Sequence, residues 1–519
     1  MNDMKQILTE WRRFLNERSV DPGFYPPQFS HMIKKLQTLA SNNWVFFDTE
    51  TSGGRGLADI LTIDAIFYDY NFKKLDEFSC KAKLRKSRVY EVDSFLVNGI
   101  DPFEMDKWSN TNFDLTKQTN EKFISWINKG DVFFCAHNGY NFDYMLTSQH
   151  LFSNLFTWPW IFSTGNARQL DSLPIVQNFD FYAPNKISFE LNEKNNKVYR
   201  LGSLAKANGF EIKDLHSSKG DTEGLVRLMN LLKEKDPSLF RQSLSFTNKK
   251  DVLSKIENTD YFCHPETFYS RTRQFTSTYL CEHPIYKGYH LVFDLKHDPE
   301  LIFSEKSNTV LKKTLSAAPK KYRTIKIGKN PFIQDKSFAT KFDDEYSTLG
   351  HEILKKRADF IIKNRKELAN RVSLIISDQF EDNSIDQTEL IPEQMIFNLN
   401  PSSNDKSLMN NFVMTNSKDE QKKIHKRFNG PLKHLSEMIL LDKWGKDGFD
   451  SNEEYKKVRK NISRRLLSTN KEVFPTIPEG MARIDVLREE KKDDKAVLEK
   501  VEAINSHLEK LASEHENYL

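Results

Sequence analysis

Short apolar segments alternate with amphipathic stretches along the first half of the chain. Four apolar segments are typical of strands: 44–47, 61–70, 74–82 and 132–136. The first and last are apolar throughout, as expected of buried strands, and Asn71 lies in the turn between the other two. Helical patterns follow at 120–128 and 221–235. Strands separated by helices predict an α/β domain with a mixed sheet.

The second half of the chain has a different pattern. Short strands are expected at 276–280, 289–295 and 322–327, which favours a small β domain. A charged helical stretch (351–376) and a polar linker (378–392) follow, and the remainder is helical. At the other end, two short helical stretches (4–16 and 29–40) flank a proline-rich break. We therefore expect four segments: an N-terminal helical extension (1–43), an α/β domain (44–248), a β domain with a trailing helix (249–380) and a helical C-terminal domain (381–519).

Length and cysteine content narrow the class of protein. A chain of 519 residues is too long for one compact core, which agrees with several domains. It has no apolar run long enough to span a bilayer, and no basic-then-apolar leader at its start, so we expect a soluble, cytoplasmic protein. The four cysteines are scattered without a C-x-x-C pair, which argues against a zinc finger or a disulfide framework.

The distribution of charge is more informative than its total. A net charge of +4 is ordinary for an enzyme, but residues 306–334 contain no acidic side chain. Basic residues with an interleaved aromatic, Tyr322, suit a phosphate backbone and an unstacked base, although an ordinary solvated face is the alternative. The basic residues of this strip include Lys312, Lys313, Lys320, Lys321, Arg323, Lys326 and Lys329.

Two carboxylates follow the first predicted strand. Asp48 and Glu50 are two residues apart, so in a strand their side chains project from the same face. Neighbouring carboxylates repel one another unless one is protonated or a cation lies between them. Hard cations such as Mg²⁺ prefer ligands of this kind. A lone D-x-E is a weak motif, but its position at the end of an apolar strand favours a metal site.

Two further polar elements occur at strand ends and helix starts. Asp143 follows the apolar strand 132–136 after a short polar loop, where it also suits a helix N-terminus. For His137 and Asn138 in that loop, capping or turn roles are the alternative, and we prefer this role for His137. His216 lies five residues before Asp221, which opens a predicted helix. Together with D-x-E, the three elements form a more specific pattern than any one alone.

This trio of motifs resembles the DEDD superfamily of 3′–5′ exonucleases, in its histidine-containing branch. The resembled pattern is D-x-E, then N-x-x-F-D, then H-x-x-x-x-D. The chain is most similar to the bacterial exonuclease I family, through the stretches 46–51, 95–102 and 200–209. Weaker matches at 283–284 and 292–295 extend the resemblance beyond the first domain.

The resemblance implies a fold, an activity and a catalytic set. The fold would be an α/β RNase H-like exonuclease domain with a mixed sheet, then a small SH3-like β domain, then an α-helical C-terminal domain. Asp48, Glu50 and Asp221 would bind one Mg²⁺ ion and Asp48 with Asp143 a second, with Mn²⁺ as a substitute. His216 would take the proton of the attacking water. The product would be nucleoside 5′-monophosphates cut from single-stranded DNA, in DNA repair or recombination.

The substrate contacts that we expect lie in two places. Around the catalytic site they are Glu50, Asn138, Phe142 and Arg200; in the β domain they are Lys320, Lys321 and Arg323. The chain departs from the resembled pattern in Thr49, Ser217 and Ser218. Gly220 is expected to weaken the helix start by roughly 0.5–1 kcal/mol relative to Ala, and so to loosen His216.

Two other functions compete with this hypothesis. An exonuclease acting on RNA, or on other DNA ends, would use the same chemistry. A non-catalytic single-strand-binding scaffold should have lost some of the five catalytic residues, and all five are present. The partners that we expect are single-stranded DNA and, through the resemblance, single-stranded-DNA-binding protein, which no motif in the chain identifies. We expect a monomer.

Overall fold

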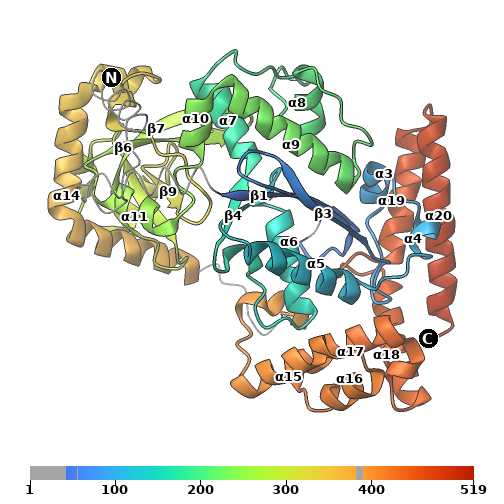
Figure 1. The fold of residues 1–519 in the computed structure, drawn as a ribbon. Coiled ribbons are helices and arrows are strands. Elements are labelled where there is room, and N and C mark those ends of the chain that lie inside the picture. The colour runs from blue at the N-terminus through green and yellow to red at the C-terminus, as the bar shows by residue number, and fades with distance from the viewer. Residues whose placement is uncertain (1–41, 55, 382–389) are drawn as a thin grey trace, which may run out of the picture. The chain divides into compact units, whose positions relative to one another are not determined.

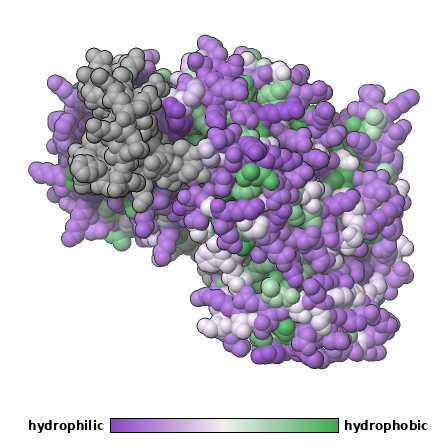
Figure 2. Space-filling model, viewed as in Figure 1, coloured by the Kyte–Doolittle hydropathy of each residue, from purple (hydrophilic) through white to green (hydrophobic). Residues whose placement is uncertain are grey.

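The structure, a computed structural model, describes residues 42–54, 56–381 and 390–519. The predicted helices at 4–16 and 29–40, and much of the predicted linker at 378–392, lie outside these ranges. Within the described part of the chain, no helix combines the length and the apolar content that crossing a membrane requires. Most residues on the face shown in Figure 2 are hydrophilic, with hydrophobic ones scattered between them.

A five-stranded mixed sheet organises the first region. Its order is β3-β2-β1-β4-β5, with β1 antiparallel to β2 and parallel to β4. The predicted strands are confirmed, and β5 is an addition that the apolar pattern did not indicate. The strands are β1 (Asn43–Thr51), β2 (Ile60–Tyr68), β3 (Lys74–Lys81), β4 (Val132–Ala136) and β5 (Ala167–Asp171).

Helices cover both faces of this sheet (Figure 1). Val45 and Phe47 of β1 pack into a core shared with α5 and α6, whereas Trp44 stacks on Phe240 of α10 on the opposite face, where α9 also contacts β1. Because both faces of β1 are covered, its run is apolar without alternation. The helices are α3 (Val92–Asn98), α4 (Pro102–Met105), α5 (Asn112–Ile127), α6 (Asp143–Ser153), η1 (Ile161–Ser163), α7 (Ser172–Tyr182), α8 (Leu201–Ala207), α9 (Ser218–Lys235), α10 (Pro237–Ser243) and α11 (Lys249–Glu257).

A second, antiparallel sheet forms a curled half-barrel in the order β6-β7-β8-β9. Its strands are β6 (Phe262–Phe268), β7 (Arg271–Glu282), β8 (Tyr289–Asp294) and β9 (Tyr322–Lys326), and the helical elements are α12 (Pro299–Phe303), α13 (Asn308–Ser316), η2 (Lys336–Phe338) and α14 (Asp344–Glu381). The three strands predicted here are confirmed, and β7 is longer than predicted. Helix α14 packs against β7. Its backbone breaks at Gly350, with φ 69°, so the long helical run begins where the sequence predicted it, at 351.

The C-terminal region is helical, as predicted. Its elements are η4 (Pro392–Phe397), α15 (Ser403–Met414), α16 (Lys418–His425), α17 (Gly430–Trp444), η5 (Gly445–Gly448), α18 (Asn452–Leu466), α19 (Ile477–Glu490) and α20 (Lys495–Glu516). Helices α19 and α20 lie beside α3 (Figure 1). A buried ion pair between Arg88 and Glu393, at 3.2 Å, joins this region to the first.

Candidate active site

The first element of the candidate site is the end of β1, where two carboxylates project from one face of the sheet. Asp48 and Glu50 are two residues apart, and residues at this spacing in a strand point the same way. Across the antiparallel register they lie opposite Asp64 and Thr62 of β2. Helix α9 contacts both strands. The strand therefore presents both carboxylates toward that helix.

The start of α9 supplies the third carboxylate and the histidine. Asp221 lies in the first turn of α9, five residues after His216. The His216 side chain is exposed. Asp48, Glu50 and Asp221 each offer a carboxylate oxygen, and these three atoms all lie within 4.8 Å of one another. Asp221, which is distant in the sequence, thus meets the two neighbouring carboxylates of β1 at one point.

The loop before α9 takes an unusual path. The backbone φ angles of Asp214 and His216 are 53° and 66°, a region that residues with a side chain rarely adopt. The Ser217 hydroxyl donates a hydrogen bond to the carbonyl of Asp214 at 2.6 Å. A Cβ atom on Gly220 would lie 2.3 Å from the carbonyl oxygen of Lys213. Gly220, which we expected to loosen the loop, is instead required for the loop to lie against the helix.

Asp143, the fourth predicted carboxylate, is the first residue of α6 and is buried. Its carboxylate accepts a hydrogen bond from the hydroxyl of Thr49 at 2.7 Å. Among the described residues, the group within 4.8 Å does not include Asp143, but its charge is near enough to raise the pKa of Asp48. Thr49, a departure from the resembled pattern, thereby orients this fourth carboxylate.

Burial and mutual repulsion both disfavour the ionised carboxylates. Burial raises the pKa of Glu50 to about 8 and that of Asp143 to about 7. It also raises the pKa of Asp48 far above its ordinary value, and the neighbouring carboxylates add to the effect. The Oδ1 atom of Asp221 is buried without a hydrogen-bond partner among the described residues. These carboxylates fit a hard divalent cation, which would offset their mutual repulsion and give the Oδ1 atom of Asp221 a partner.

His137, in the loop between β4 and α6, is a structural residue. Its ring nitrogens lie 2.8 Å from the Ser172 hydroxyl and 2.7 Å from the Tyr199 carbonyl oxygen. Burial lowers its pKa to about 4, so the ring stays neutral near pH 7. With both nitrogens occupied, His137 ties the loop to its neighbours, which agrees with the non-catalytic role preferred from the sequence.

The same loop is held from two sides. Asp171, at the end of β5, accepts hydrogen bonds from the N–H groups of Asn138 at 2.8 Å and Tyr140 at 3.0 Å. Lys329, which follows β9, donates to the Tyr140 carbonyl at 3.1 Å. The sequence did not single out Asp171, because an Asp before a helix usually indicates only a cap. Lys329 contacts the loop that leads to Asp143.

The other predicted substrate contacts lie at the edges of this loop and at α8. Asn138 has a φ angle of 63°, and its side-chain oxygen accepts a hydrogen bond from Asn141. Phe142 precedes α6 and packs partly against the sheet core. Arg200 is exposed at the N-terminal end of α8.

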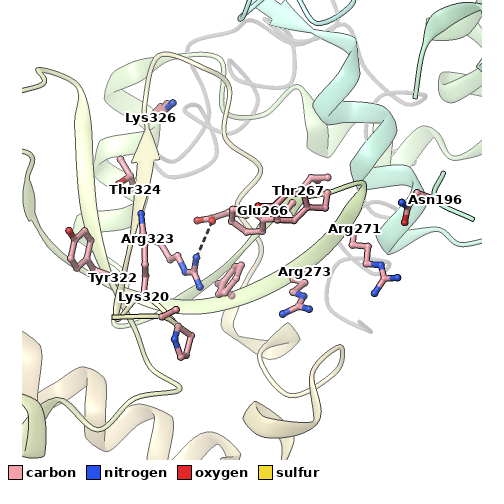
Figure 3. Close-up of a pocket in the computed structure, with 15 residues that line it drawn as sticks. Asn196, Glu266, Thr267, Arg271, Arg273, Lys320, Tyr322, Arg323, Thr324 and Lys326 are labelled. Carbon is pink, nitrogen blue, oxygen red and sulfur yellow. Dashed lines mark ion pairs between the residues drawn. The ribbon is translucent and has the colours of Figure 1, made fainter. Parts of the chain in front are cut away.

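A groove of about 1180 Å³ lies on the second sheet. One side is formed by β9 and the residues before it, including Lys320 and Lys326; the other is formed by β6, β7 and the turn between them (Figure 3). Arg271 and Arg273 of β7 are both exposed. Tyr269, in the turn, is 96% exposed. Basic and aromatic side chains therefore line the groove from two separate segments.

Arg323 also lines this groove, but it is already engaged. Its guanidinium lies 3.5 Å from the Glu266 carboxylate, an ion pair drawn in Figure 3, and 3.8 Å from the centre of the Phe275 ring. Burial raises the pKa of Glu266 to about 7. Because its guanidinium is paired with Glu266, Arg323 forms part of the groove wall and is less available than the exposed basic residues to bind a phosphate.

The basic strip of the sequence is divided in the structure. Lys320, Arg323 and Lys326 line the groove. Lys321 does not, and its ammonium donates to the Pro319 carbonyl at 2.6 Å. The remaining lysines of the strip lie elsewhere: Lys312 and Lys313 are on α13, and Lys329 contacts Tyr140.

No protein-family model matches the chain. Curated relatives are nevertheless found by sequence. Exodeoxyribonuclease I of Buchnera aphidicola (subspecies Schizaphis graminum) is 24% identical over 253 residues, which are 48% of this chain and 52% of the relative. Exodeoxyribonuclease I of Escherichia coli K12 is 23% identical over 285 residues, 53% of this chain and 58% of the relative. The chain spans about half the length of the curated relatives it matches.

Solved structures extend the likeness over most of the chain. An exonuclease I from Methylocaldum szegediense has a TM-score of 0.76 at 16% identity, covering 91% of this chain and all of that one (100%). E. coli exonuclease I in complex with a dA16 oligonucleotide has a TM-score of 0.74 at 17% identity, with coverage of 91% and 100%. Similar structures also include SSB/Exonuclease I with an inhibitor and a zinc-bound E. coli complex with single-stranded DNA. The chain is thus similar in sequence to exodeoxyribonuclease I over about half its length, and it has the fold of the exonuclease I structures.

Proposed function

We propose that this protein is a divalent-metal-dependent 3′–5′ exonuclease that degrades single-stranded DNA to nucleoside 5′-monophosphates. The observation that carries the proposal is the meeting of Asp48, Glu50 and Asp221 within 4.8 Å, at the start of the helix that follows His216. The family relationship supports the same activity.

We propose that the site binds two Mg²⁺ ions, for which Mn²⁺ would substitute; the convergence of Asp48, Glu50 and Asp221 supports the first of them. Asp48, Glu50 and Asp221 would hold one ion, and Asp48 with Asp143 the other. When bound, such ions stabilise the attacking and leaving oxygens of an in-line displacement at phosphorus. The zinc-bound E. coli complex supports metal binding in the family.

The protein's own groups supply the acid–base chemistry. His216 accepts a proton from the attacking water while the new P–O bond forms. The bond between phosphorus and the 3′-oxygen of the preceding nucleotide breaks, which releases a 5′-monophosphate, and the 3′-oxygen takes up a proton from solvent to become a new 3′-hydroxyl. Exposure of the imidazole suits this role, because the proton can pass on to solvent.

We propose that the groove on the second sheet binds the single-stranded DNA. Exposed Arg271, Arg273, Lys320 and Lys326 would contact phosphates, and Tyr269 would stack on a base. The E. coli relative binds a dA16 oligonucleotide, which supports single-stranded DNA as the substrate. Near the site, Glu50, Asn138, Phe142 and Arg200 would contact the terminal nucleotides.

Finer features follow from the same proposal. The SSB/Exonuclease I structure supports single-stranded-DNA-binding protein as a partner. We also propose that the enzyme is monomeric and cytoplasmic and acts in DNA repair or recombination. Its domains would be 44–248, 249–380 and 381–519.

An exonuclease on RNA remains the second candidate, because the site chemistry is the same. The test is digestion of matched single-stranded DNA and RNA oligonucleotides, labelled at the 3′ or the 5′ end, with and without Mg²⁺. We expect immediate release of the 3′ label as mononucleotide, from DNA only and only with Mg²⁺. Faster loss of RNA would change the substrate, and binding without cleavage under every condition would favour a non-catalytic scaffold.

A further inference from the structure

Asp64 is an acidic residue beside the active site that the catalytic set does not use. It lies directly opposite Asp48 in the β1–β2 register, and Thr62 lies opposite Glu50. The two β2 residues paired with the D-x-E carboxylates are therefore themselves polar. They are separated by Ile63, which is fully buried on the other face.

Both of these β2 side chains meet one residue of α9. The Ser218 hydroxyl donates to the Asp64 carboxylate at 2.5 Å, and it lies 2.8 Å from the Thr62 hydroxyl. Since a hydroxyl has a single proton, the Thr62 hydroxyl must be the donor in the second bond. Thr222, one turn further along α9, donates to the Asp64 carbonyl at 3.1 Å.

Hydrogen bonds matter here because apolar contacts come later in the helix. The first turn of α9 consists of Ser218, Lys219, Gly220 and Asp221, and its buried apolar residues begin only at Leu225. Ser218 is 2% exposed, so its bonds are shielded from water. The preceding loop has two unfavourable φ angles and would not hold this turn by itself.

We propose that Thr62, Asp64 and Ser218 form a polar staple that positions the first turn of α9, and with it Asp221 and His216, against the strand carrying Asp48 and Glu50. The three are positioning residues, since they act through the site and do not touch the substrate. The inference rests on the proposed function for its effect on turnover, but not for its effect on structure.

The experiment combines enzyme kinetics, Mn²⁺ binding and hydrogen exchange on the full-length protein. Ser218→Ala should lower kcat and Mn²⁺ affinity by roughly 10- to 100-fold, the usual effect of losing a partner that orients a metal ligand. The KM for DNA should stay the same, because the groove is unaltered. In the metal-free protein, hydrogen exchange should accelerate at residues 218–222 and not at the β1 amides.

Paired variants separate positioning from general damage. Thr62→Ser keeps the hydroxyl and should behave as wild type, whereas Thr62→Val keeps the shape and should be impaired. Asp64→Asn keeps an acceptor for Ser218 and should retain most of its Mn²⁺ affinity, whereas Asp64→Ala should match Ser218→Ala. Ser79→Ala is the control, since Ser79 pairs with Asp64 on β3 but is exposed.

Three outcomes would overturn the staple. They are wild-type Mn²⁺ binding and exchange in Ser218→Ala, equal loss in Thr62→Ser and Thr62→Val, or equal loss of Mn²⁺ affinity in Asp64→Asn and Asp64→Ala, which would make Asp64 a metal ligand. A wild-type protein that fails to cleave DNA would instead refute the proposed function. The exchange measurement would still decide the staple in that case.

Discussion

The acidic site and the basic groove are both built from charged side chains, but they differ in how the sequence encodes them. In the site, strand geometry places Asp48 beside Glu50, and a helix start brings Asp221 to them. In the groove, Lys320 and Arg273 line one surface only because β6 to β9 fold into one sheet. A carboxylate cluster can thus follow from local spacing, whereas a run of lysines does not reveal which of them share a surface.

If the acidic site hydrolyses DNA and the basic groove binds it, then variants of the site should lose hydrolysis and keep binding. Asp48→Asn, Glu50→Gln, Asp143→Asn and Asp221→Asn should each abolish cleavage, because each removes one of the carboxylates that we propose as metal ligands. Binding of single-stranded DNA in the groove should persist. Turnover measured with Mg²⁺, beside Mn²⁺ titration calorimetry and circular dichroism, checks this. Wild-type turnover in any of them would remove that residue from the site.

His216→Ala should have the next largest effect. A positioned acid–base group is worth roughly 10²–10⁴-fold in rate, so turnover should fall by that much. Affinity for DNA should change little, because the imidazole acts on water and not on the strand. Single-turnover rates and filter binding distinguish the two effects. A collapse of affinity with normal chemistry would make His216 a binding residue.

The groove variants should act on affinity and leave the chemistry alone. Changing Arg271 and Arg273 together to Ser should lower the logarithmic salt slope for long oligonucleotides by about 0.7 per lost phosphate contact. The matched control is the pair Lys312→Ser and Lys313→Ser on α13, outside the groove. The salt slope of this control should be that of the wild type. Equal salt slopes in the arginine variant and in the lysine control would mean that the groove does not bind the single-stranded DNA.

The smallest effect expected is on stability against pH without metal. The folded pKa of Glu50 is about 8, above its ordinary value of 4.5, so the folded protein retains a proton that the unfolded chain releases. This stabilisation is complete below pH 4.5 and is lost as the pH rises through about 8. The melting temperature in EDTA should therefore fall over that interval.

Two additions sharpen the pH prediction. Glu50→Gln should flatten the decline, whereas Glu77→Gln, an exposed carboxylate on β3, should not. Because Mg²⁺ binds the ionised form, it should raise the melting temperature more at pH 8 than at pH 6. A melting temperature that rises with pH in the metal-free wild type would contradict the assigned environment of Glu50.

The fold could be predicted from the sequence wherever burial on both faces left an unbroken apolar run. Val132–Ala136 was predicted with the bounds that the structure has. The strand Ala167–Asp171 was not, since Arg168 and Gln169 interrupt it and only its pairing with β4 identifies it. Such a short edge strand is defined by its neighbour rather than by its own composition.

The site could be predicted only as far as its motifs carry it. The convergence of Asp48, Glu50 and Asp221 is present, while their binding of metal stays a prediction. Asp64 was missed because it is the only charged residue in an otherwise largely apolar strand. Its alternation with Thr62, two polar positions on one face of β2, was the pattern that could have revealed it.

The most direct test is to measure binding and cutting of one single-stranded DNA in two variants side by side. We predict that Asp221→Asn binds the oligonucleotide like wild type and does not release its 3′ nucleotide. The Arg271→Ser and Arg273→Ser double variant should bind more weakly, yet cleave at the wild-type rate once saturated. Loss of both DNA binding and cleavage in either variant would contradict the assignment of hydrolysis to the acidic site and of DNA binding to the groove.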